Sequence, residues 1–75
     1  MSRHYMLYAL SDPSKADRIV GEIGKVDGVR DVKISEDLHE MAIDMDAGRI
    51  TAVMERVVNI CSRISNGCEV RYKFI

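Results

Sequence analysis

Hydrophobic residues in this chain recur at two spacings, and the two spacings alternate along the sequence. Strand-like spacing of two residues runs through four segments, and helix-like spacing of three to four residues runs through two. The strand-like segments are residues 5–10, 29–34, 39–45 and 68–75. The helix-like segments begin near Pro13 and Asp46 and end at Asp27-Gly28 and at Ser65-Asn66-Gly67. The order is strand–helix–strand twice, with a polar turn at residues 35–37 between the two units.

This order predicts an α+β fold of the ferredoxin-like βαββαβ type. Two right-handed strand–helix–strand units pair into a four-stranded antiparallel sheet with both helices on one face. The first and third strands would be central, and the other sheet face would stay uncovered, which explains the charged residues at alternate strand positions. A chain of 75 residues has room for one core, so we expect a single domain over residues 1–75.

Capping signals predict where the helices begin. Asp12 precedes Pro13, and a carboxylate at the cap followed by proline at the first helical position is a favourable start. Ser14, with Asp17 three residues later, is a competing start signal. Asp46 is predicted to cap the second helix.

Composition argues against several classes of function. The formal net charge of −1 provides no field that would attract nucleic acid, and the sheet lacks the basic and stacking aromatic residues of RNA-binding relatives of this architecture. The apolar runs are far shorter than a membrane span, so we expect no membrane insertion and a cytoplasmic location. Two histidines and scattered acidic residues do not assemble a nucleophile with its base, so we do not expect an enzyme.

The chain resembles the heavy-metal-associated domains of soft-metal chaperones and metal-pumping ATPases. The resemblance covers almost the whole chain and rests on element order, on residues 5–10 and 23–32 (with Lys25-Val26-Asp27-Gly28-Val29) and on the helix around residues 57–61. It implies the βαββαβ fold. In the family it also implies a Cys-x-x-Cys loop after the first strand, whose thiolates bind Cu(I), zinc or cadmium.

Asp12 and Lys15 occupy the positions in this chain that match the two family cysteines. Asp12 offers a hard oxygen ligand, and Lys15 places a cation where a cation would have to bind. We therefore expect no metal at this loop and no cofactor there.

Cys61 and Cys68 allow a second interpretation. Antiparallel pairing of the first and last strands would bring both cysteines and Asp12 to one end of the molecule. These three residues would then form a relocated, weak site for Cu(I) or Zn(II). The simpler interpretation, which we favour, is that both cysteines fill the core as reduced thiols.

The open sheet face is the predicted interaction surface. Alternation assigns five residues to it: Met6, Tyr8, Lys33, Asp44 and Arg71. A weak copper site of His4 and Met6 is one interpretation of this face, and a patch that meets a protein partner or a second copy is the one that we favour. The free edge of the last strand is a second surface on which a sheet could be extended across a dimer.

The sequence thus predicts a non-enzymatic interaction module with a disabled metal loop, engaged in protein contact or self-association in metal handling. Two alternatives stay open. One is a soft-metal carrier or sensor that uses Cys61 and Cys68. The other is a small-ligand regulatory domain similar to ACT domains, which share the architecture and bind ligands at dimer interfaces.

Overall fold

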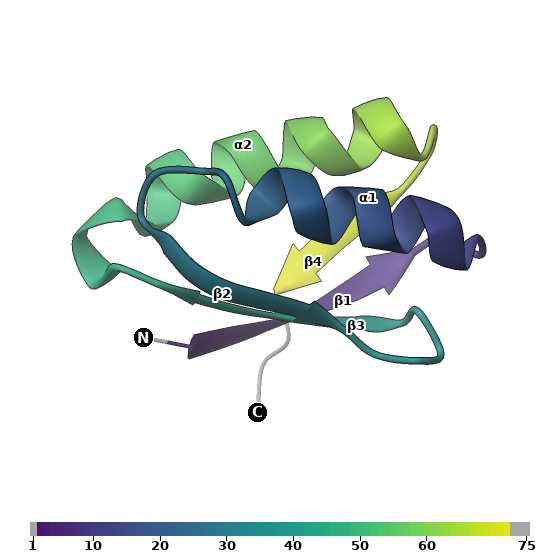
Figure 1. The fold of residues 1–75 in the computed structure, drawn as a ribbon, viewed down its shortest axis with the longest axis horizontal. Coiled ribbons are helices and arrows are strands. Elements are labelled where there is room, and N and C mark those ends of the chain that lie inside the picture. Colours follow the sequence, from purple (N-terminus) through teal and green to yellow (C-terminus); the bar gives the residue numbers. More distant parts are fainter. Residues whose placement is uncertain (1, 73–75) are drawn as a thin grey trace.

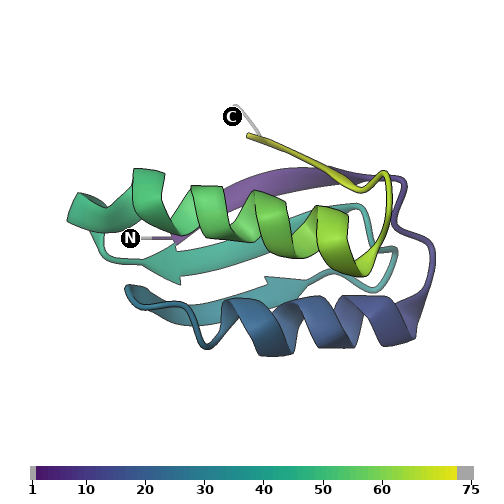
Figure 2. The same cartoon turned by 90° about the horizontal axis from the view of Figure 1, so that it is seen from above.

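The computed structural model describes residues 2–72 and has the predicted element order. The elements are β1 (Ser2–Tyr8), α1 (Pro13–Ile23), β2 (Val29–Ile34), β3 (Glu40–Met45), the short 3-10 turn η1 (Ala47–Arg49), α2 (Ile50–Ile64) and β4 (Glu69–Tyr72). The strands form one sheet in the order β2-β3-β1-β4, and each neighbouring pair is antiparallel. Both helices cover the same face of this sheet (Figure 1) and run side by side across it (Figure 2). The predicted βαββαβ fold, with the first and third strands central, is confirmed.

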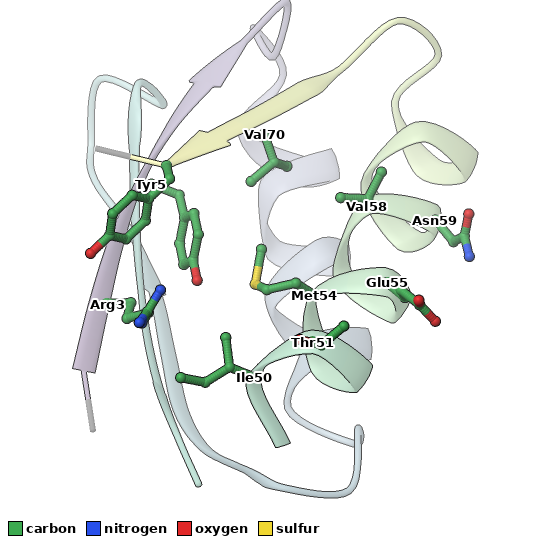
Figure 3. Close-up of a pocket in the computed structure, with 10 residues that line it drawn as sticks. Arg3, Tyr5, Ile50, Thr51, Met54, Glu55, Val58, Asn59 and Val70 are labelled. Carbon is green, nitrogen blue, oxygen red and sulfur yellow. The ribbon is translucent and has the colours of Figure 1, made fainter. Parts of the chain in front are cut away.

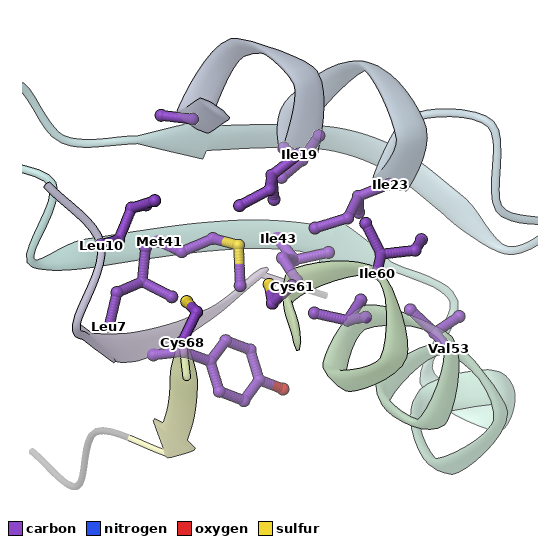
Figure 4. Packing of buried hydrophobic residues seen from close by; sticks show 14 of the residues in the cluster. Leu7, Leu10, Ile19, Ile23, Met41, Ile43, Val53, Ile60, Cys61 and Cys68 are labelled. Atoms are coloured by element: carbon purple, nitrogen blue, oxygen red, sulfur yellow. The ribbon is translucent and has the colours of Figure 1, made fainter. Parts of the chain in front are cut away.

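The core lies between the sheet and the two helices, as Figure 4 shows. Alternate residues of the central strand β3 point into it: Met41, Ile43 and Met45 are at most 1% exposed. The helices contribute residues three or four positions apart, among them Ile19 and Ile23 of α1 and, from α2, Val53, Val57, Ile60 and Cys61. Each fully buried aliphatic side chain contributes about 1.5–3 kcal/mol, so these two periodicities account for most of what holds the layers together.

The start of α1 is the predicted one. The Asp12 carboxylate accepts hydrogen bonds from the Ser14 backbone N–H at 3.0 Å and from the Ser14 hydroxyl at 2.8 Å. Pro13 is the first helical residue, where its missing N–H leaves no bond unmade. Ser14 therefore donates to the cap and does not act as the cap itself, so the competing start is wrong.

The predicted cap of the second helix is wrong. Asp46 precedes η1, and its carboxylate makes no capping hydrogen bond. The carboxylate instead faces Arg30 of β2, with 2.9 Å between the Asp46 Oδ1 and the nearer guanidinium nitrogen. Arg30 offers a charged donor that outcompetes neutral backbone amides for this carboxylate. The chain makes a 3-10 turn first, and α2 begins at Ile50.

Two residues with positive φ shift strand boundaries from the predicted ones. One ends β1 early, and the other delays the start of β3. Ala9 has a φ of 64°, and β1 stops at Tyr8 although apolar residues continue to Leu10. Leu38 has a φ of 63° in the turn before β3, which begins at Glu40. The last strand was predicted to reach residue 75. Its described part ends at Tyr72, and residues 73–75 lie outside the described part of the chain.

Candidate functional site

The loop between β1 and α1 carries Asp12 and Lys15, the two residues that the sequence resemblance places at the positions of metal ligands. Asp12 is fully exposed, and its hydrogen bonds from Ser14 hold the pKa of its carboxyl below the usual value. The Lys15 ammonium lies close enough to lower that pKa further. The loop thus offers one hard oxygen ligand that is already engaged in capping, beside a positive charge. Neither group fits a soft metal ion.

The two cysteines meet in the core. Cys61, in the last turn of α2, is completely buried, and Cys68, just before β4, is 6% exposed. Both are free thiols whose side chains lie among the buried apolar residues (Figure 4). Each thiol is near enough to the other to influence its pKa, so the two side chains lie close together. The two cysteines lie together at the end of the molecule where the topology predicts them, and a metal site made from them stays a prediction.

Burial keeps these thiols protonated. It raises the pKa of Cys61 to about 12, with smaller contributions from the neighbouring Cys68, and it raises the pKa of Cys68 as well. Asp12 does not join the pair: among residues 2–72, no three His, Cys, Asp or Glu side chains gather closely enough to hold a metal ion. The arrangement is that of two small apolar side chains in a core.

Five residues that were assigned to the interaction surface lie on the sheet face opposite the helices. We call Met6, Tyr8, Lys33, Asp44 and Arg71 the open-face patch. They alternate along the strands with core residues such as Leu7, Val32 and Ile43, so their side chains point away from the helices. The burial pattern has these positions alternating with core residues, and their role as an interaction surface stays a prediction.

Aromatic and basic side chains stack at one side of the open-face patch. Tyr8 is 46% exposed, and the Arg71 guanidinium lies 5.3 Å from the centre of its ring. The same guanidinium is 3.2 Å from the Glu69 carboxylate. Met6 lies opposite Arg71 on one side and opposite Glu40 on the other, since β1 pairs with both β4 and β3. The patch therefore combines an apolar centre with charges of both signs.

A groove between α2 and the β1–β4 side of the sheet was not foreseen from the sequence. It has a volume of about 650 Å³ and is lined by Arg3 and Tyr5 of β1, by residues of α2, and by Val70 and Tyr72 of β4 (Figure 3). The only sequence signal was that Met54 and Val58 widen the apolar stripe of α2 beyond the core.

Neither helix of residues 2–72 has the length and apolar character needed to cross a bilayer.

Comparison with known proteins identifies the fold. No family model and no curated protein matches the sequence. Solved structures do match. Oxidized MerP from Ralstonia metallidurans CH34 aligns with a TM-score of 0.76 at 12% identity, over 99% of this chain and 97% of that one. The yeast copper transporter domain Ccc2a, solved in apo and Cu(I)-loaded states, aligns with a TM-score of 0.73 at 15% identity, over 97% and 94%.

A third solved structure extends the same likeness. The copper chaperone of Enterococcus hirae, in its apo form, aligns with a TM-score of 0.67 at 19% identity, over 95% of this chain and 98% of that one. The fold predicted from the resemblance, that of heavy-metal-associated domains, is therefore confirmed. At identities this low, the likeness concerns the fold, and the chemistry has to be argued from the residues of this chain.

Proposed function

We propose that this chain is a non-enzymatic, single-domain interaction module with the heavy-metal-associated fold, whose metal loop is disabled and whose task is contact with a protein partner or with a second copy. The observation that carries the proposal is the loop after β1. Domains of this fold that are described as Cu(I)-loaded or as copper chaperones are this chain's structural neighbours. In this chain the corresponding loop offers the capping carboxylate of Asp12 and the ammonium of Lys15.

The chemistry of soft metals supports a disabled loop. Cu(I) is held by polarizable thiolate or thioether ligands, and a single carboxylate next to a cation provides neither. Removing Asp12 from its cap to serve a metal would also leave the first amides of α1 without their acceptor. The loop is suited to starting a helix.

Contact with a protein is supported by the open-face patch. It presents an exposed tyrosine and a methionine among charges of both signs, the composition found in interface cores with polar rims. Tyrosine and arginine are also the residues that most often dominate binding energy at such surfaces, and here Tyr8 and Arg71 are stacked on each other. The outer edge of the short strand β4 lies beside this patch and can accept a further strand.

Self-association and metal content can be measured in one experiment. The reduced protein is incubated with Cu(I), Zn(II) or Cd(II) and its mass is determined under native conditions over a range of protein concentrations. We expect metal-free chains with a concentration-dependent dimer. We expect that dimer to be weakened by Met6→Asp and by Tyr8→Ala, and to persist in Arg18→Ala, a matched change on the exposed side of α1. One metal per chain, or a strictly monomeric metal-free chain that also fails to bind in a partner screen, would refute the proposal.

Soft-metal carriage by Cys61 and Cys68 is the second candidate, and the contact between the two thiols favours it. Binding of a soft metal would require the cysteines to lose their protons. With a pKa of about 12, only roughly one Cys61 thiol in 10⁵ is a thiolate at pH 7. Carriage predicts thiolate-to-metal charge-transfer absorption on titration with Cu(I), lost in Cys61→Ser and in Cys68→Ser. We expect no such absorption.

A further inference from the structure

The groove between α2 and the β1–β4 side of the sheet has one apolar wall and one wall that carries hydrogen-bond donors. From α2, Ile50, Met54 and Val58 face it at spacings of four residues, as one stripe of the helix. From the sheet, Arg3 and Tyr5 face it (Figure 3). Its volume of about 650 Å³ lies within the range of about 300–1,000 Å³ that is usual for small-molecule sites.

The Tyr5 hydroxyl is a buried donor without an acceptor. Tyr5 is 4% exposed, and in the described part of the chain its O–H donates to no acceptor, while the Arg3 side chain is near enough to donate to its oxygen. Leaving a buried polar group unsatisfied is costly, and such groups in native proteins usually mark a site that something else completes. An acceptor supplied by a bound molecule would satisfy this hydroxyl.

The Arg3 guanidinium lies beside this hydroxyl. Burial raises the pKa of Tyr5, and the positive charge of Arg3 opposes that rise, which places the two groups close together. Arg3 is also held in place, because its guanidinium stacks over the Tyr72 ring at 5.1 Å, and the Tyr5 and Tyr72 rings meet edge-to-face with centroids 5.7 Å apart. A charged donor and a neutral donor thus converge at one end of an apolar groove.

We propose that this groove binds a small monocarboxylate with an apolar body, its carboxylate accepting from Arg3 and the Tyr5 hydroxyl and its body packing on Met54, Val58 and Val70. A carboxylate suits both donors because it is planar, charged and accepts two hydrogen bonds. Glu55 lies on the α2 rim of the groove, where its carboxylate would repel a second negative charge on the ligand. This argues against polyanions such as nucleotides. The groove is complete within one chain and does not need the dimer interface at which ACT domains bind ligands.

The test uses 4-phenylbutyrate as probe and 4-phenylbutanol as its uncharged counterpart, in titrations followed by two-dimensional NMR of the ¹⁵N-labelled full chain. We expect saturable shifts confined to the groove-lining parts of β1, β4 and α2, and at least ten-fold weaker binding of the alcohol, because hydrogen bonds to charged groups are the stronger ones. If saturation with the probe changed the molecular mass of the protein from that of one chain to that of two, the site would be made by two chains. That result would overturn the proposal.

Matched variants separate the donors from the fold. Arg3→Gln and Tyr5→Phe each remove one donor and keep most of the side chain's volume, and we expect each to weaken 4-phenylbutyrate at least ten-fold while amide dispersion stays native. Binding of 4-phenylbutanol should change less than three-fold in both. Arg18→Gln, on the exposed side of α1, should bind like the wild type. Equal affinity of acid and alcohol, no saturable shift at millimolar probe, or full affinity in Tyr5→Phe and Arg3→Gln would each overturn the proposal.

Discussion

Replacing Cys61 by serine tests whether this side chain belongs to the apolar core or to a site built for a ligand. The change keeps the size of the side chain nearly constant and exchanges a weakly polar sulfur for a hydroxyl at a position that is 0% exposed. Burying a hydroxyl costs about 1–3 kcal/mol in protein variants. A serine in a helix can recover part of this by donating to the carbonyl four residues earlier, as Ser62 does to Val58 at 2.9 Å. We therefore expect Cys61→Ser to lower the free energy of unfolding by about 2 kcal/mol.

The corresponding shift in melting temperature follows from the size of the chain. An unfolding entropy of about 2.1 cal/mol/K per residue gives roughly 160 cal/mol/K for 75 residues. A loss of about 2 kcal/mol then lowers Tm by roughly 12 °C. Cys61→Ala, which removes the sulfur without adding a polar atom, should cost about 1 kcal/mol and roughly 6 °C.

The assay is thermal and urea unfolding under reducing conditions, followed by circular dichroism. Ser62→Ala is the matched control, since Ser62 is the exposed neighbour and should change stability by no more than about 0.5 kcal/mol. A serine variant as stable as the wild type, or more stable than the alanine variant, would mean that Cys61 lies in a polar environment. The reasoning about the core thiols would then be refuted.

Three further predictions concern pH, the backbone and the metal loop. Because burial raises the pKa of Cys61 to about 12, the folded state keeps its proton while the unfolded chain loses it, so stability is fully present below about pH 8.5 and falls as pH rises towards 12; urea midpoints should fall less in Cys61→Ala. Ala9 is exposed with a φ of 64°, so Ala9→Gly should raise the free energy of unfolding by about 1 kcal/mol, and an unchanged or lower midpoint would contradict the strain. The double variant Asp12→Cys, Lys15→Cys should gain one Cu(I) per chain in a chelator competition, because it places two thiols at a helix N-terminus, and the single variants should bind much less.

The fold could be predicted because its signals are local. Alternation in β3 and the three-to-four spacing in α2 each span a single element, and the handedness of strand–helix–strand units leaves few ways to combine them. The proximity of Cys61 and Cys68 followed from the same topology. The cap at Asp12 was also predictable, because all of its partners lie within two residues.

The features that escaped prediction depend on residues far apart in the chain. Asp46 fails to cap because Arg30, 16 residues away, takes its carboxylate. The groove is lined by Arg3, Met54 and Val70, which come from three different elements, and no spacing along the sequence predicts that they lie together. Outside glycine, the positive φ values of residues 2–72 fall on Ala9 and Leu38, which are not residue types that favour that conformation.

A competition for Cu(I) between the reduced wild-type chain and a coloured Cu(I) chelator tests the disabled metal loop most directly. The fall in chelator absorbance reports copper taken by the protein, and the double cysteine variant serves as the positive control. We predict that the wild-type chain leaves the chelator spectrum unchanged at equimolar protein. Transfer of one copper ion per wild-type chain would contradict the account.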